Sequence, residues 1–232
     1  MSTPEIPDVL EPRLREAPPV QRAFLWERSV WEPVVHDVPD AAEVLQELPD
    51  RIDRQIVRDV VQANLTRDRV LGALVAVLIW GGTESLRAFV ARAILTGMRR
   101  QGTWEMPVDD SIRERLLEGA RRVREDGAVP AFRYMNNEGK VKHLGSSYFT
   151  KWLAFASMTG EIDGPEVAPI LDEQVINWIN KNTMPSERLR TAKTPSYERY
   201  LELLDAWGAP HDRTPTQVEL AIFELTRDRP AQ

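Results

Sequence analysis

Residues 70–79, VLGALVAVLI, would be apolar on nearly every side of a helix. A surface helix needs only one apolar stripe, whereas a helix that is apolar all round has to be covered by other elements. Thr66 or Asp68 can begin this helix, and Trp80-Gly81-Gly82 breaks it. The stretch therefore predicts a buried helix.

Helical spacing continues along the chain. Apolar residues recur at intervals of three and four from Asp40 and again from Ile52. Further helices are predicted at about 83–96, with Thr83 as N-cap, and at about 110–124, 147–158, 172–182, 196–207 and 215–226. Residues 127–130 (GAVP) interrupt the pattern, and residues 131–143 fit either a turn or a short hairpin. Strand-like alternation is scarce, so we predict a mostly α fold that can include a small β element.

Composition limits what the chain can be. Its 232 residues, 42% of them hydrophobic, suit one globular unit or two small lobes. Residues 1–39 are rich in proline and charge, and we predict an N-terminal arm packed on a helical domain formed by residues 40–232. Apolar runs of about 18 residues and a signal-peptide core are both missing, which favours a soluble, cytoplasmic protein.

Several kinds of site are excluded. Without cysteine the chain can form no disulfide, zinc–thiolate site or iron–sulfur cluster, and its three histidines lack metal-site spacing. P-loop, dinucleotide-binding and serine-hydrolase motifs are missing as well. The net charge of −6 argues against a partner held by bulk positive charge, but not against one held by backbone groups and a local basic patch.

The stretch 143–157, HLGSSYFTKWLAFAS, places a tight Gly-Ser turn in front of an apolar helix. Backbone N–H groups at such a turn point outward and, with the helix dipole behind them, bind phosphate. The same turn can equally be an ordinary helix entry. Downstream come a loop with Gly160, Gly164, Pro165 and Pro169, and then Ile170-Leu171-Asp172 at the start of another helix.

Turn, loop and aspartate in this order resemble the helix-hairpin-helix DNA glycosylases, most closely bacterial proteins of the 8-oxoguanine DNA glycosylase fold. The resemblance implies two helical lobes flanking a cleft, a hairpin at about 140–158 and a Gly/Pro–Asp loop at 159–172. Two departures stand out. His143 replaces the usual first glycine of the hairpin, and the spacing from Gly145 to Asp172 is longer than in compact relatives.

The resemblance also implies catalytic roles. Asp172 would stabilise the oxocarbenium-like charge that develops as a base departs, or activate the attacking water; an aspartate there is also a good N-cap. Lys151 would be the nucleophile that forms a Schiff base with the sugar. In strict register the family's lysine falls on Ser147, where water-using adenine glycosylases carry serine. Lys151 lies one turn later on the same face, and a lysine that merely extends along a helix flank toward solvent is the alternative.

Binding residues follow from the same resemblance. The hairpin would grip DNA through Leu144, Gly145, Ser146 and Ser147, with Lys140, Lys142 and His143 on a basic rim; Arg99-Arg100 and the arginines at 121, 122 and 124 are weaker rim candidates. Aromatic groups would hold a flipped base, and the candidates are Trp80, Tyr148 and Trp178, then Trp104, Phe132 and Tyr134. The family holds a monovalent cation with hairpin carbonyls; no other cofactor or metal is expected.

These features together predict a monomeric DNA glycosylase that acts on double-stranded DNA. It would excise an oxidised or otherwise modified base, in repair or in defence against phage with modified bases such as hypermodified cytosines. Strand cleavage (AP-lyase activity) would accompany excision if Lys151 attacks the sugar. The alternatives are a non-catalytic helix-hairpin-helix DNA-binding module and a helical protein–protein interaction domain, which the acidic net charge favours.

Overall fold

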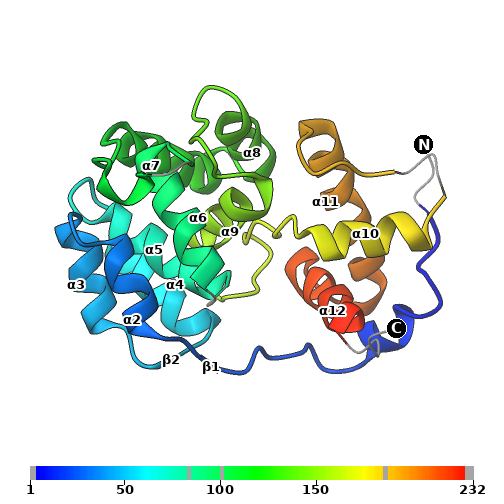
Figure 1. Ribbon diagram of the computed structural model, residues 1–232. Helices are drawn as coiled ribbons and strands as arrows, with labels where there is room; N and C mark the ends of the chain where they lie inside the picture. The colour runs from blue at the N-terminus through cyan, green and yellow to red at the C-terminus, as the bar shows by residue number, and fades with distance from the viewer. Residues whose placement is uncertain (1–3, 83–84, 100–101, 185–187, 228–232) are drawn as a thin grey trace.

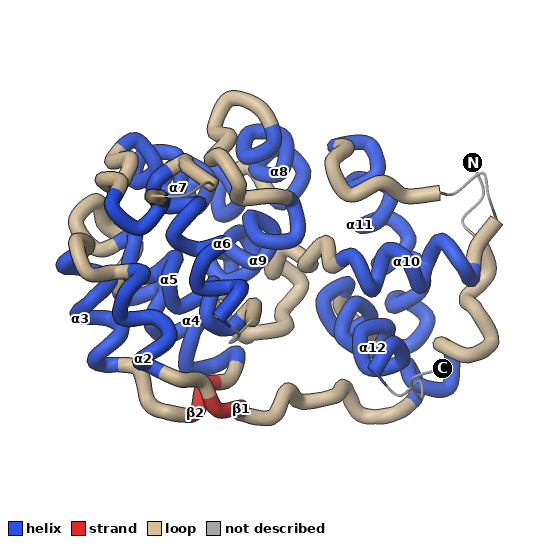
Figure 2. The backbone as a smooth tube through the Cα atoms, in the orientation of Figure 1, coloured by secondary structure: helices blue, strands red, loops and turns tan. Residues whose placement is uncertain are grey.

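The structure is a computed structural model that describes residues 4–82, 85–99, 102–184 and 188–227. Helices dominate it, and the only sheet among these residues is a short antiparallel pair, β1 (Phe24–Leu25) with β2 (Arg51–Ile52) (Figure 2). The predicted mostly α fold with a small β element is confirmed. In the described part of the chain, every helix is too short or too polar to cross a membrane.

Two helical lobes lie side by side (Figure 1). The large lobe contains α2 (Arg28–Trp31), η1 (Glu32–Val34), α3 (Pro39–Glu47), α4 (Arg54–Ala63), α5 (Val70–Trp80), α6 (Ser85–Thr96), η2 (Thr103–Glu105), α7 (Ser111–Glu125), α8 (Ala128–Asn136) and α9 (Ser146–Ser157). The small lobe contains α1 (Glu11–Arg15), α10 (Glu173–Asn182), α11 (Thr194–Gly208), η4 (Ala209–His211) and α12 (Pro215–Arg227).

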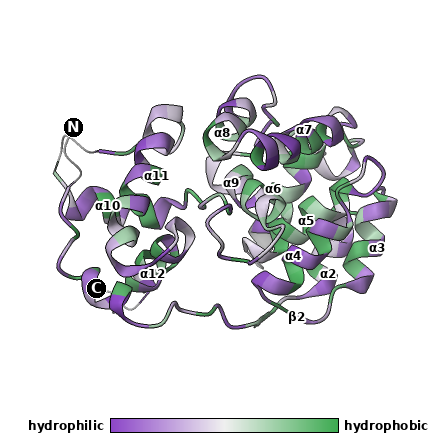
Figure 3. Ribbon diagram, turned by 180° about the vertical axis from the view of Figure 1, so that it is seen from behind, coloured by the Kyte–Doolittle hydropathy of each residue, from purple (hydrophilic) through white to green (hydrophobic). Residues whose placement is uncertain are grey.

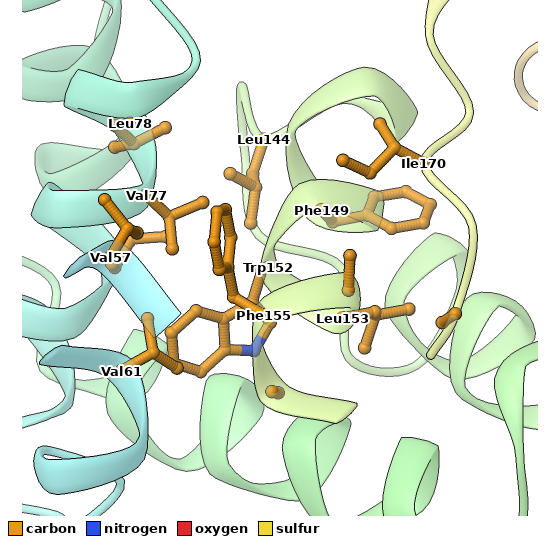
Figure 4. Packing of buried hydrophobic residues seen from close by; sticks show 14 of the residues in the cluster. Val57, Val61, Val77, Leu78, Leu144, Phe149, Trp152, Leu153, Phe155 and Ile170 are labelled. Carbon is orange, nitrogen blue, oxygen red and sulfur yellow. The ribbon is translucent and has the colours of Figure 1, made fainter. Parts of the chain in front are cut away.

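Helix α5 occupies the centre of the large lobe, where α3, α4, α6, α7 and α9 pack around it. All residues from Val70 to Ile79 are buried, as their apolar character predicts. The Val70 amide bonds to the Thr66 carbonyl, so the turn leading into the helix opens at Thr66. The close-up of this core shows Trp152 and Phe155 of α9 among valines of α4 and α5 (Figure 4).

Both ends of the chain build the small lobe. Leu10 and Leu14 of the N-terminal segment are buried, and the indole of Trp207 in α11 donates a hydrogen bond to the Pro4 carbonyl. The guanidinium of Arg213 donates to the carbonyls of Leu14 and Glu16. The helices of this lobe and the two segments that join the lobes carry both hydrophobic and hydrophilic residues (Figure 3). The lobes are therefore connected twice, by the segment before β1 and by the loop from α9 to α10.

One stretch differs from the sequence prediction. Residues 128–136 form α8, so residues 127–130 begin a helix and do not merely interrupt one, and the hairpin alternative for 131–143 is wrong. Gly127 precedes α8 with φ of +92°, and Pro130 sits in the first helical turn, where the missing N–H is no loss. The four later helices begin and end within about two residues of their predicted limits, in line with ordinary boundary scatter. Thr83, the predicted N-cap of α6, lies outside the described residues.

Candidate active site

A cavity of about 510 Å³ lies between the two lobes. Helices α4, α5 and α9 contribute Arg54, Trp80 and Lys151 from the large lobe. The loop before α10 contributes Asp172, and α12 contributes Glu219 from the small lobe. The cavity has the size of a ligand site, and polar side chains from both lobes line most of it.

Lys151 and Asp172 meet in this cavity. The Nζ of Lys151 lies 3.2 Å from an Asp172 carboxylate oxygen and 3.0 Å from the Ser147 carbonyl, one turn earlier in α9. The side chains are 11% and 20% exposed, so the pair is shielded from bulk water but open to the cavity. Gly81 leaves room for the lysine, because a Cβ there would lie 3.3 Å from its Cδ. An amine and a carboxylate thus face the same space.

The loop that carries Asp172 is held by buried side chains. The Leu171 amide donates to the Thr150 hydroxyl of α9 at 3.0 Å, and the Ile170 amide to the Glu219 carboxyl at 3.1 Å. The Tyr200 hydroxyl of α11 donates to the Ile170 carbonyl at 2.9 Å. Asp172 itself accepts from the Gln174 amide at 2.9 Å, which makes it the N-cap of α10. Elements of both lobes therefore fix where the carboxylate points.

The turn before α9 lies beside the cavity and is open to solvent. Gly145 is the N-cap of α9 without a side-chain cap, and the amides of Gly145, Ser146 and Ser147 have no hydrogen-bond acceptor in the part of the chain that the structure describes. These outward donors at a helix N-terminus can hold a phosphate. His143 has φ of +67°, a left-handed conformation that glycine adopts without strain. The residue that replaces the usual glycine thus keeps a glycine-like backbone.

Comparison with known families gives one match. The model of the family described as "Putative 8-oxoguanine DNA glycosylase OGG-like protein" matches residues 17–223, a range that spans both lobes and the cavity between them. The chain belongs to this family. No curated protein and no solved structure matches it.

The aromatic candidates in this OGG-like protein divide into two groups. Trp80 and Tyr148 line the cavity; Trp80 donates to Gln21 at 2.8 Å, and the Tyr148 hydroxyl bonds to Arg87. Trp178 does not line it and is buried in the small lobe. Asn177, one residue earlier, faces the cavity, and one residue along a helix turns the side chain by about 100°. The weaker candidates also lie elsewhere: Trp104 against Phe89, Phe132 stacked on Tyr197, and Tyr134 beside Arg122.

The basic candidates for the DNA-binding rim also fall into two groups, those beside the turn and those engaged elsewhere. Lys140 and Lys142 are exposed beside the turn, and His143 is half-buried, where burial and the nearby Lys142 lower its pKa. The arginines of α7 are engaged elsewhere, because Arg121 and Arg122 pair with Glu118 and Arg124 donates to the Ala156 carbonyl. Arg100 lies outside the described residues.

Two buried charged residues of the cavity, Arg54 and Glu219, were missed from the sequence. Arg54 and Glu219 are 5% and 4% exposed. Burial raises the pKa of Glu219 to about 7, although the Arg54 charge opposes this shift. Each lies on an amphipathic helix, where a charged residue normally faces solvent. Local sequence therefore holds no signal that would have separated them from surface residues.

Metal binding has little support among the described side chains, which form no group of three or more histidines and carboxylates suited to a metal. The hairpin offers a different donor set. The carbonyls of Lys142, His143 and Leu144 accept no hydrogen bond from described residues, and carbonyl oxygens are the ligands that hard cations prefer. These groups fit the monovalent cation that the resemblance implies, and the cation stays a prediction.

Proposed function

We propose that this OGG-like protein is a DNA glycosylase that excises a modified base from double-stranded DNA. The observation that carries the proposal is the pair Lys151–Asp172, 3.2 Å apart in a cavity between two lobes. A base must leave the duplex to be cut, and a cavity lined by Trp80 and Tyr148 can receive it. The turn at Gly145 supplies phosphate-binding amides beside the entrance.

The chemistry assigns one role to each group. Lys151, once deprotonated, attacks C1′ of the flipped nucleotide while the C1′–N bond breaks and its electron pair leaves with the base. The Asp172 carboxylate stabilises the positive charge that develops on the sugar. Nζ then gives up a proton, and the C1′–O4′ bond breaks with its electron pair on O4′, which takes up a proton. The C=N bond of a Schiff base forms between C1′ and Nζ, and from this state the strand can be cleaved. The family description makes oxidised guanine the first substrate to test.

The alternative route uses water. Asp172 would then activate a water molecule, Lys151 would only hold the carboxylate, and the product would be an intact abasic strand. The contact of Nζ with the carboxylate fits both routes, and the product of the reaction distinguishes them.

Borohydride trapping tests the proposal. The wild-type protein is incubated with duplexes that each carry one modified base, in the presence and absence of borohydride. Lysine attack predicts a covalent protein–DNA adduct that Lys151→Gln abolishes, while the matched variant Lys181→Gln, on an exposed position of α10, still forms it. Full excision by Lys151→Gln without any adduct would exclude the lysine route but keep the glycosylase. If the wild-type protein removes no base from any duplex, the proposed function is wrong.

A further inference from the structure

Arg54 stands out because it is buried without an acceptor. It is the first residue of α4, is 5% exposed and lines the interlobe cavity. Within the described residues its guanidinium makes no hydrogen bond, and its Nε is buried without a partner. The Trp80 ring, whose centroid lies 5.6 Å away, gives it a cation–π contact. Burying a guanidinium without acceptors is costly, and a cation–π contact offsets only part of that cost.

Glu219 does not fully compensate the buried charge of Arg54. Glu219 lies in the same cavity on the opposite lobe, and the charges of the two side chains act on each other. Even so, no ion pair within 4.0 Å joins Arg54 to a carboxylate in the described ranges. One Glu219 oxygen is already used by the Ile170 amide. Arg54 therefore lines the cavity with N–H donors that have no acceptor among the described residues.

The position of Arg54 indicates what enters that space. Arg54 is 5% exposed and lies against the Trp80 ring, whereas the turn at Gly145 is open to solvent. A flipped base that enters the cavity can therefore reach Arg54, while the backbone phosphates would stay at the turn. As the bond to C1′ breaks, the electron pair passes onto the base, where a ring carbonyl conjugated with the departing nitrogen takes up the negative charge. A preorganised guanidinium beside that oxygen would stabilise the charge as it forms.

We propose that Arg54 holds the departing base by donating to its ring carbonyl oxygen, and that the enzyme is therefore selective for oxo bases over adenine-type bases. The inference rests on the proposed base excision and extends it to a substrate class. Guanine-, uracil- and cytosine-type bases carry a suitable carbonyl, whereas adenine-type bases carry none. The base leaves as an anion paired with Arg54 and takes up a proton from water.

Single-turnover excision tests the inference. The duplexes carry 8-oxoguanine, hypoxanthine, uracil or 5-hydroxymethylcytosine as oxo bases, and adenine opposite 8-oxoguanine or 1,N6-ethenoadenine as adenine-type bases. At least one oxo base is expected to be excised, and neither adenine-type base. Arg54→Met should lower the rate by about 10²–10³-fold, the usual loss on removing one preorganised donor, with duplex affinity unchanged. Arg67→Met is the matched control, because Arg67 is exposed, pairs with Asp110 and Glu114 and lies outside the cavity.

A second readout needs no catalysis. Free 8-oxoguanine and free adenine are titrated against the protein while its tryptophan fluorescence is followed, since Trp80 lines the cavity. The oxo base alone should bind, and Arg54→Met should lose that binding. Should this variant fail to fold, Arg54→Lys replaces it; a lysine keeps the charge without the planar fork and should cost at least about tenfold in rate.

The outcomes separate the two proposals. Excision of an adenine-type base as fast as the best oxo base, or a wild-type rate for the folded Arg54 variant, overturns the role of Arg54 and leaves the glycosylase intact. If no duplex is cut by the wild-type protein, the proposed function fails, and the inference fails with it.

Discussion

Replacing Glu219 by glutamine should make the protein's stability less sensitive to pH. The side chain is 4% exposed, and glutamine can still accept the hydrogen bond from the Ile170 amide. Burial raises the pKa of Glu219 from 4.5 to about 7 in the folded chain. The folded state therefore keeps a proton that the unfolded state loses as pH rises through this range, so folding stability falls with rising pH.

The size of the effect follows from the two pKa values. Between pH 5 and pH 8 the wild-type protein should lose about 2 to 3 kcal/mol of unfolding free energy relative to Glu219→Gln. Urea unfolding of both proteins without DNA, at several pH values, measures this difference. At each pH the wild-type protein is compared with Glu219→Gln, so the contributions of the other titrating groups cancel. Glu224→Gln is the control, because Glu224 lies on the same helix but its side chain is 36% exposed. A wild-type-minus-variant difference that stays constant from pH 5 to pH 8 would refute the reasoning.

Three further variants test the site. Asp172→Asn keeps the N-cap of α10 and should lower base excision by about 10²–10³-fold while duplex affinity and thermal unfolding change little; a normal excision rate would remove Asp172 from the chemistry. Gly145→Val should fold normally, because its φ is −71° and a Cβ there meets nothing within 4 Å, yet should weaken binding to all duplexes alike in a fluorescence-anisotropy titration. Unchanged affinity would mean that the turn does not hold a phosphate. Tyr200→Phe deletes a buried hydrogen bond to the Asp172 loop and should cost about 1 kcal/mol in urea unfolding, together with slower excision; a loss of stability with no change in excision would show that this bond does not position Asp172.

Local patterns in the sequence predicted much of the helical fold. The buried α5 follows from an apolar run that a surface helix could not carry, and the later helices follow from spacing and capping residues. Helix α8 was missed because Pro130 resembles a breaker in sequence, although the first turn of a helix accepts it. The composition of the small lobe could not be predicted, since it depends on contacts such as Trp207 with Pro4, which lie at opposite ends of the chain.

The candidate site was predictable only where a motif marks it. The order of turn, loop and aspartate singled out Lys151 and Asp172, which the structure brings together. Trp178 was misplaced because composition does not say which face of a helix meets a cavity. Arg54 and Glu219 resemble surface charges until the two lobes are placed against each other.

The small lobe's use of both chain ends has a consequence for synthesis of the protein. Residues 26–157 leave the ribosome as one continuous stretch that contains the whole large lobe and can begin to fold at once. Leu10 and Leu14 emerge earlier still, yet α12, against which α1 packs, is translated after the large lobe. During elongation these two leucines therefore remain unburied. The cavity needs residues from both lobes, among them Glu219 of α12, and therefore forms only after α12 has been translated.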